Sequence, residues 1–270
     1  MKRIDLIKQQ HEIKIGDVCG TIEPNVTEDS LFYDNGELIG FYIKDMNNYS
    51  ERLTKLSDVA NKEFRSKNVP KSVMNRSDTM KAFKDGLSWA EAAKFGVSQY
   101  STILGSTPPR HHMRRPYAST SSVHNVKSAE TFVKAMLMLC EESEKLIALI
   151  APNIYERQKQ IIETNIPKKW RFGNLFTSSI SNYNIAASFH RDAGNLEGCV
   201  NVIIAKKHNA TGGNTTVPDY NATMDSCDNS MLVYPAWRNV HGVTPIIPLK
   251  EGGYRNSLVF YPLKAFKGLD

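Results

Sequence analysis

The clearest periodic pattern in the chain lies between residues 128 and 150. Ser128 is expected to cap the start of a helix there, and Pro152 allows a second helix to begin and run to about Thr164. Apolar residues recur at spacings of three and four in the first helix, which forms one apolar stripe. The stripe consists of Phe132, Ala135, Met136, Leu139, Leu146, Ile147 and Ile150.

The first 116 residues give fewer signals. A strand is predicted over Leu38–Ile43, directly after the turn sequence Asp34-Asn35-Gly36. Residues 77–95 are predicted to be helical, and residues 105–116 are predicted to form a loop that contains Pro108-Pro109. That loop carries a basic cluster of Arg110, His111, His112, Arg114 and Arg115.

After Pro167 the pattern changes to short strand-like runs separated by Gly, Asn, Asp and Pro. This texture is typical of a small sandwich or closed barrel of antiparallel strands. We therefore expect a single α+β domain, in which mainly helical residues 1–166 support a β-core formed by residues 167–270. The predicted strands are 185–189, 199–205, 231–234 and 257–261.

Composition narrows the class of protein only slightly. The chain has 270 residues and a net charge of +6, which permits a polyanionic partner such as nucleic acid without requiring one. The four cysteines are too widely spaced for a Cys-x-x-Cys zinc knuckle and fit reduced thiols. The polar N-terminus and the lack of a run of about 20 apolar residues predict a cytoplasmic protein that is neither secreted nor membrane-bound.

The strongest chemical signal is His190-Arg191-Asp192, followed by His241. Side chains alternate between the two faces of a strand, so His190 and Asp192 are expected to point the same way. Two imidazoles and one carboxylate are the facial triad that holds non-haem Fe(II) and leaves coordination positions open. The alternative is that His190 is a core imidazole held by Asp192.

A second signal lies 14 residues beyond His241, where Arg255 and Ser257 share one face of the last predicted strand. A guanidinium can grip a carboxylate through two hydrogen bonds, and a serine hydroxyl adds a further donor. The pair therefore suits an acidic co-substrate beside the metal, whereas the simpler interpretation of Arg255 is a surface ion pair.

These residues resemble the TET/JBP family of 2-oxoglutarate- and Fe(II)-dependent dioxygenases, which oxidise the 5-methyl group of pyrimidines in DNA. The resemblance rests on His190-Arg191-Asp192 with Asn195, on His241, and above all on the final strand Arg255-Asn256-Ser257-Leu258-Val259-Phe260-Tyr261. It extends upstream through Ala151–Tyr155 and Arg171–Gly173, and covers residues 100–265.

The resemblance implies a double-stranded β-helix, that is, a jelly-roll barrel, with the iron at one mouth. It implies that the enzyme uses Fe(II), 2-oxoglutarate and O2 and acts on a methylated base flipped out of DNA, with no obligate protein partner. The implied residue roles are iron binding by His190, Asp192 and His241; co-substrate binding by Arg255, Ser257, Asn182 and Arg115 (or Arg114); and base binding by Asn195 and Tyr261.

The chain also departs from the family. Leu263 stands where the mammalian cytosine-oxidising members have a base-contacting histidine, so the choice between 5-methylcytosine and thymine stays open. The family's cysteine-rich zinc region is missing. Trp237 is a further candidate for the base pocket, and the basic runs 110–115 and 168–171 are candidates for phosphate contacts. The alternative functions are a protein side-chain hydroxylase of the prolyl type and a non-catalytic jelly-roll binding module.

Overall fold

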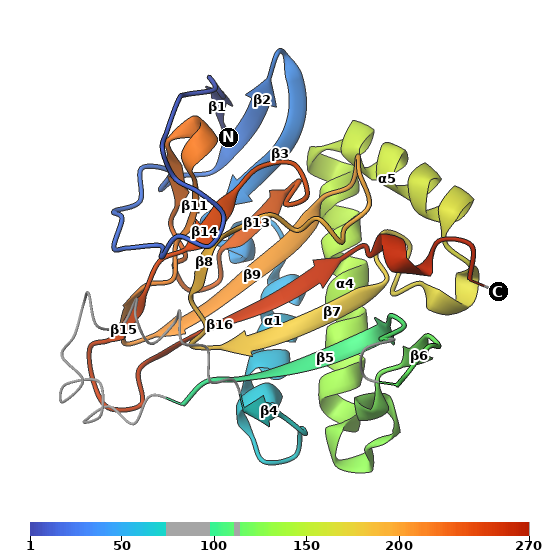
Figure 1. The fold of residues 1–270 in the computed structure, drawn as a ribbon. Helices are drawn as coiled ribbons and strands as arrows, with labels where there is room; N and C mark the ends of the chain where they lie inside the picture. Colours follow the sequence, from blue (N-terminus) through green and yellow to red (C-terminus); the bar gives the residue numbers. More distant parts are fainter. Residues whose placement is uncertain (74–97, 111–113, 270) are drawn as a thin grey trace.

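The computed structural model describes residues 1–73, 98–110 and 114–269; the predicted helix at 77–95 lies outside them (Figure 1). Its α-helices are α1 (Glu51–Arg65), α4 (Glu130–Ile150) and α5 (Pro152–Asn165). The short 3₁₀ turns are η1 (Met46–Asn48), η3 (Ser122–Asn125), η4 (Lys127–Ala129), η5 (Lys168–Trp170), η6 (Pro218–Tyr220) and η7 (Lys264–Phe266).

The strands form one large sheet and two smaller ones. The large sheet has the order β1-β2-β3-β13-β9-β16-β7-β5-β4, with β6 paired to β5, and only β1 and β2 are parallel neighbours in it. Its strands are β1 (Lys2–Asp5), β2 (Ser30–Asp34), β3 (Glu37–Ile43), β4 (Ser72–Val73), β5 (Tyr100–Thr107), β6 (Ser119–Thr120), β7 (Ser178–Tyr183), β9 (Asn201–His208), β13 (Met231–Tyr234) and β16 (Tyr254–Tyr261).

A four-stranded sheet of order β12-β11-β14-β8 and a two-stranded sheet β10-β15 complete the fold. These sheets and the large sheet form the jelly roll, so the predicted α+β class and jelly-roll core are confirmed. The strands are β8 (Ala187–His190), β10 (Ala210–Gly212), β11 (Thr215–Val217), β12 (Ala222–Met224), β14 (His241–Val243) and β15 (Ile246–Pro248).

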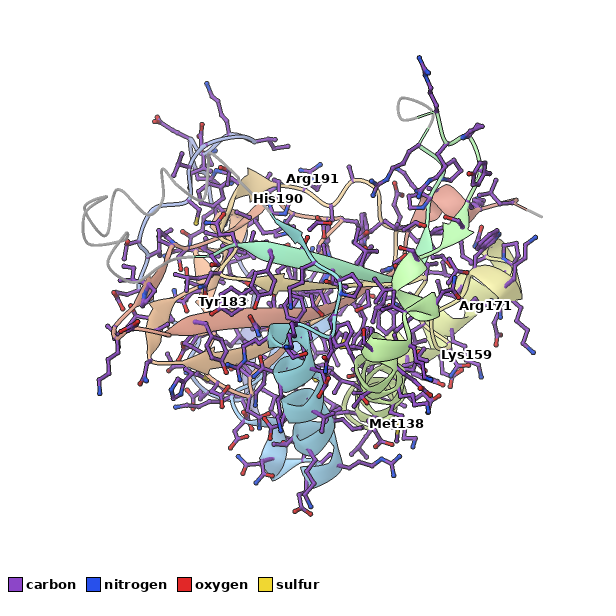
Figure 2. All side chains as sticks on the ribbon, turned by 90° about the horizontal axis from the view of Figure 1, so that it is seen from below. Met138, Lys159, Arg171, Tyr183, His190 and Arg191 are labelled. Carbon is purple, nitrogen blue, oxygen red and sulfur yellow. The ribbon has the colours of Figure 1, made fainter. Side chains whose placement is uncertain are left out.

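The two faces of β16 have different roles. Leu258 and Phe260 belong to the main apolar core, which also contains Phe132 and Met136 of α4. The helices lie on this side of the large sheet, whereas His190 lies on the opposite side (Figure 2). Because side chains alternate along a strand, the odd-numbered residues of β16 face the interior of the jelly roll.

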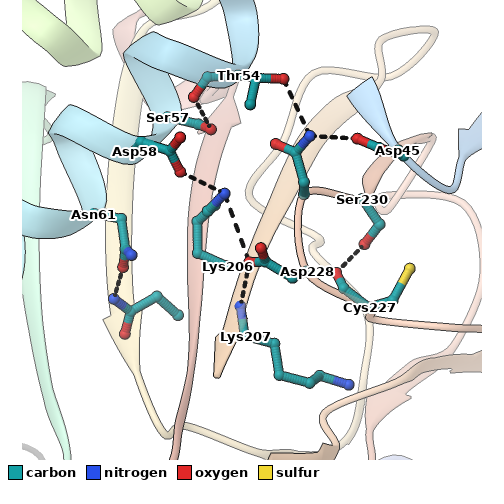
Figure 3. A network of polar contacts seen from close by, with 12 residues as sticks. Asp45, Thr54, Ser57, Asp58, Asn61, Lys206, Lys207, Cys227, Asp228 and Ser230 are labelled. Atoms are coloured by element: carbon teal, nitrogen blue, oxygen red, sulfur yellow. Dashed lines mark hydrogen bonds and ion pairs between the residues drawn. The ribbon is translucent and has the colours of Figure 1, made fainter. Parts of the chain in front are cut away.

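Polar contacts attach the helices to the sheet. The buried Lys206 on β9 forms an ion pair with Asp58 of α1 at 2.7 Å and a longer one with Asp228 at 3.5 Å (Figure 3). On α5, the fully buried Gln158 donates to the carbonyl oxygens of Leu175 and Val200 and accepts from the Val200 amide. Both helices are therefore fixed in position relative to the strands that carry the site.

Several local predictions agree with the structure. The strand at 231–234 has the predicted bounds, and the turn before β3 contains Asn35 and Gly36, both at positive φ, as in a tight hairpin. The helices at 130–150 and 152–165 are confirmed within two residues.

Two local predictions differ from the structure. Ser128 does not cap α4, because its hydroxyl donates to the Asn68 carbonyl oxygen and Ala129 occupies the cap position. The described part of residues 1–166 contains strands as well as helices, and its strands β3 and β5 pair directly with β13 and β7 of the C-terminal half. Pairing between strands that are distant in the sequence therefore crosses the predicted boundary at residue 166.

The described part of the chain contains no helix with both the length and the apolar character needed to cross a membrane.

Replacing Gln158 tests whether its hydrogen bonds fix α5 in position. We expect Gln158→Ala to lower the free energy of unfolding by about 2–4 kcal/mol, because it leaves two buried carbonyl groups and one amide without partners. Gln160→Ala on the exposed side of the same helix is the matched control and should change stability by less than about 0.5 kcal/mol. Equal effects in denaturant titrations would show that Gln158 does not anchor the helix.

Candidate metal centre and co-substrate pocket

The pairing of β8 with β14 brings the two histidines together. His190 and His241 are direct cross-strand partners, and their ring centroids lie 4.4 Å apart. Asp192 follows β8 by two residues, so its side chain returns to the same side. One ligand atom from each of the three residues lies within 4.8 Å of the other two, which fits a single metal ion.

Hydrogen bonds orient both imidazole rings. Nδ1 of His190 lies 2.7 Å from the Ser188 carbonyl oxygen, and Nδ1 of His241 lies 3.1 Å from the Asn239 carbonyl oxygen. A carbonyl oxygen can only accept, so each Nδ1 carries the proton and each Nε2 keeps its lone pair for a metal. This is the usual arrangement around metal-binding histidines.

His241 is suited to binding a cation at neutral pH. Burial, together with the neighbouring His190, lowers the pKa of its imidazole to about 4. The ring is therefore neutral under ordinary conditions, and a metal ion does not have to displace a proton from it.

Two asparagines hold the carboxylate of Asp192. Asn201 on β9 donates to Asp192 Oδ2 at 2.9 Å, and Asn195 makes a longer contact with the same oxygen at 3.4 Å. Asn195 also donates to Oδ1 of Asn201 at 2.9 Å. No pattern in the sequence singles out Asn201, because its role depends on how β9 lies beside the loop after β8.

A cavity of about 520 Å³ contains the three residues and extends along β16. One end is lined by the buried residues Arg255, Ser257 and Thr215 and by the half-buried Asn182. The other end opens beside the exposed Arg191 and is lined by Asn195, Tyr261 and Leu263. Between the two ends, the walls are apolar: Ile180, Ile185, Ile203, Val243 and Val259.

Arg255 places a positive charge at the buried end. The residue is only 3% exposed, and its Nε donates to the Ser226 hydroxyl at 2.9 Å. Desolvation lowers the pKa of its guanidinium to about 10, and within the described part of the chain it forms no ion pair with a carboxylate. A buried cation without a counter-ion is costly, so this end of the cavity is suited to an anionic ligand. The simpler interpretation of Arg255 as a surface ion pair is thus wrong.

Ser257 and Asn182 flank the same position. They are direct partners across β16 and β7, so their side chains lie on one face of the sheet, the face that also carries Arg255. The structure therefore brings together three of the four residues expected at the co-substrate.

Arg115 is the exception. It does not line the cavity, and its guanidinium donates to the Pro108 carbonyl oxygen at 2.9 Å. Arg114 is an exposed residue at positive φ and does not line the cavity either. Arg110, which pairs with Arg115 through an isolated β-bridge, is close enough to the cavity for its positive charge to act against the raised pKa of the Tyr261 hydroxyl.

The remaining candidates separate into two groups. Tyr261 is at the open end, where burial and then Asp192 raise the pKa of its hydroxyl to about 12, so it stays protonated. Trp237 donates to the Cys199 carbonyl oxygen and does not line the cavity. Arg171, from the second basic run, lies far from His190 (Figure 2).

This donor set and the buried guanidinium define the site of a 2-oxoglutarate- and Fe(II)-dependent oxygenase. Residues 105–264 match the model of the Tet_JBP family, described as the oxygenase domain of the 2OGFeDO superfamily. The match spans more than half of the chain, so the protein belongs to this family. It is accordingly a dioxygenase that uses Fe(II), 2-oxoglutarate and O2.

A solved structure with a similar fold and two weaker matches were found. NgTET1 in complex with 5mC DNA is 13% identical, with a TM-score of 0.56 over 94% of this chain and 85% of that one. A 2OG-Fe(II) oxygenase family protein from Burkholderia pseudomallei is 14% identical, with a TM-score of 0.40 over 78% and 80% of the two chains. A full-length Neurospora crassa protein in complex with alpha-KG is 11% identical, with a TM-score of 0.41 over 82% and 74%. No curated protein matches the chain.

The contact between Asn201 and Asp192 can be tested by metal binding. We expect Asn201→Ala to weaken Fe(II) binding by about 10–100-fold, because Oδ2 of Asp192 loses its shorter hydrogen bond and keeps only the longer contact with Asn195. Ser188→Ala is the control, since only the backbone carbonyl of Ser188 contacts His190. Anaerobic titration with Fe(II) measures both, and unchanged affinity in Asn201→Ala would contradict the assigned role.

Proposed function

We propose that this dioxygenase oxidises the 5-methyl group of a pyrimidine in DNA, with 5-methylcytosine as the preferred base. The observation that carries the proposal is one cavity that joins a His-Asp-His cluster to a buried guanidinium, which has no carboxylate partner among the described residues, and to Asn195 and Tyr261.

In this proposal, His190, Asp192 and His241 hold Fe(II). The two Nε2 atoms and the Asp192 carboxylate fit the metal, because the other nitrogen of each imidazole is already bonded to a carbonyl oxygen. When bound, Fe(II) would activate O2, which is the oxidant, and 2-oxoglutarate would supply two of the four electrons through its oxidative decarboxylation to succinate and CO2.

Arg255 and Ser257 bind the distal carboxylate of 2-oxoglutarate, and Asn182 stands beside them as a further polar contact. Ion pairing with this carboxylate offsets the cost of burying Arg255. The co-substrate would be held at Arg255 and Ser257 within the cavity that the three metal-binding residues also line. The apolar walls exclude water from the space between them.

DNA is the proposed substrate because NgTET1, which shares this fold, was captured with 5mC DNA. The net charge of +6 suits a polyanion. A methyl group inside a duplex cannot reach a metal in a cavity, so the base has to flip out of the stack, which costs a few kcal/mol. Tyr261 at the open end provides an aromatic face for that base. Arg110 and Arg191, near the same end, are the proposed phosphate contacts.

The hydrogen bonds of Asn195 favour cytosine over thymine. Because the Asp192 carboxylate only accepts, Asn201 must turn its amide nitrogen toward it, and its Oδ1 therefore faces Asn195. The Asn195 amide nitrogen donates to that oxygen, so its own Oδ1 is the atom it can offer to a ligand. An acceptor matches the amino group at position 4 of cytosine, whereas thymine has a carbonyl oxygen there.

The activity can be tested directly. The purified protein is incubated with Fe(II), 2-oxoglutarate and DNA containing 5-methylcytosine, and the DNA is digested to nucleosides for mass spectrometry. We expect hydroxymethylated cytosine, and none with Asp192→Ala, which loses a metal ligand. Absence of any oxidised pyrimidine with the native protein, under conditions where it binds Fe(II) and 2-oxoglutarate, would reject the proposed substrate.

Base preference is a separate prediction. Matched oligonucleotides that present either 5-methylcytosine or thymine at one unpaired position should differ in kcat/KM by at least about 100-fold in favour of 5-methylcytosine, because thymine would leave two acceptors facing each other. Equal rates would show that Asn195 does not select the base.

A further inference from the structure

A second positive charge stands beside Arg255 at the buried end of the jelly roll. Lys207 on β9 is the direct cross-strand partner of Arg255 on β16. It has the same strand parity as Asn201 and Ile203, which line the cavity, so it lies on the interior face of the sheet. Two like charges in directly opposed positions destabilise a sheet, so this pair requires a compensating contact.

Lys207 contributes to the wall that supports Arg255. Its Nζ donates to the Gly212 carbonyl oxygen at 2.7 Å. Gly212 and Gly213 both have positive φ, and a Cβ on Gly213 would lie 3.1 Å from Cδ and Nε of Arg255. The backbone of this two-glycine turn therefore packs against the side chain of Arg255, and the ammonium of Lys207 holds the turn there.

The surroundings of Lys207 leave its charge weakly compensated. It lines a second cavity of about 520 Å³ behind Arg255, which is also lined by Gly212, Asn214 and Thr244. Within residues 1–73, 98–110 and 114–269, its ammonium forms no ion pair at 4.0 Å or less. The charged and titratable groups around it are Arg255 on β16, Asp225, Cys227 and Asp228 in the loop before β13, and Glu23 of the N-terminal segment.

We propose that Lys207 is a positioning residue for the co-substrate: its ammonium holds the Gly212–Gly213 turn against Arg255 and adds a second positive charge for the distal carboxylate of 2-oxoglutarate. The proposal rests on the assignment of Arg255 to that carboxylate. Arg255 lines the cavity that holds the metal cluster, whereas Lys207 does not line that cavity. Lys207 acts instead by holding the turn in place and through the electrostatic field of its charge.

A pH dependence follows from this arrangement. Burial and then Arg255 lower the pKa of Lys207 to about 8. The side chain is charged below this pH and becomes neutral as the pH rises through it. The affinity for 2-oxoglutarate should therefore fall between pH 7 and pH 9, and a bound carboxylate should raise the pKa of Lys207 in return.

Calorimetric titration of the full chain loaded with Mn(II) tests the proposal without turnover. Lys207→Met should raise the Kd for 2-oxoglutarate about tenfold at pH 7, the size expected for one lost interaction with a partly buried charge. Lys207→Arg should stay within about twofold of the native value, because the charge is kept. Lys250→Met, which removes an exposed lysine between β15 and β16, is the matched control and should have no effect.

A second ligand distinguishes the loss of the Lys207 charge from general damage to the structure. 2-Oxovalerate keeps the keto acid but lacks the distal carboxylate, so Lys207→Met should change its Kd by less than about twofold. The fall in 2-oxoglutarate affinity from pH 7 to pH 9 should be present in the native protein and absent from Lys207→Met. Thermal unfolding of each variant shows whether it is folded at the temperature of the titration.

Three results would overturn the inference. These are a native Kd for 2-oxoglutarate in Lys207→Met, equal weakening of 2-oxoglutarate and 2-oxovalerate, or the same pH profile in the native protein and the variant. Arg255→Met distinguishes this failure from that of the proposed function. If it also leaves the Kd for 2-oxoglutarate unchanged, the co-substrate anchor itself is wrong; if it raises the Kd, only the role of Lys207 is rejected.

Discussion

The antiparallel pairing of β8 with β14 is the constraint on which the site depends. It sets His190 directly opposite His241, and the chain that continues from β8 returns Asp192 to the same side. Backbone carbonyl oxygens next to each histidine then fix which imidazole nitrogen is free. A shift of this pairing by one residue would turn one histidine to the other face of the small sheet and leave two ligands instead of three.

The large sheet supplies the complementary half of the site. Arg255 is buried at one end of β16, and Tyr261 lies at the other end of the same strand on the same face. An extended strand of eight residues thus sets the distance between the proposed sites for the co-substrate carboxylate and for the base, in a cavity that the metal cluster also lines. The buried charge of Arg255 lacks a carboxylate partner among the described residues, which favours binding of an anionic ligand at this end of the cavity.

The sequence was sufficient to predict those parts of the site that follow from the alternation of side chains along a single strand. The spacing of His190 and Asp192, and of Arg255 and Ser257, predicts shared faces without knowledge of any partner strand. The sequence did not predict contacts that depend on the register between distant strands, such as those of Asn201 and Lys207. Helix α1 was not predicted, although Ser50 caps it. The co-substrate role of Arg115 rested only on the family resemblance, and its guanidinium instead donates to the Pro108 carbonyl oxygen.

The most direct test of this account is a crystal structure of the protein with Mn(II) and 2-oxoglutarate. The account predicts one metal ion bound by Nε2 of His190, Nε2 of His241 and a carboxylate oxygen of Asp192, with the distal carboxylate of the co-substrate paired to the guanidinium of Arg255. A metal ion bound elsewhere, or a co-substrate whose distal carboxylate avoids Arg255, would contradict it.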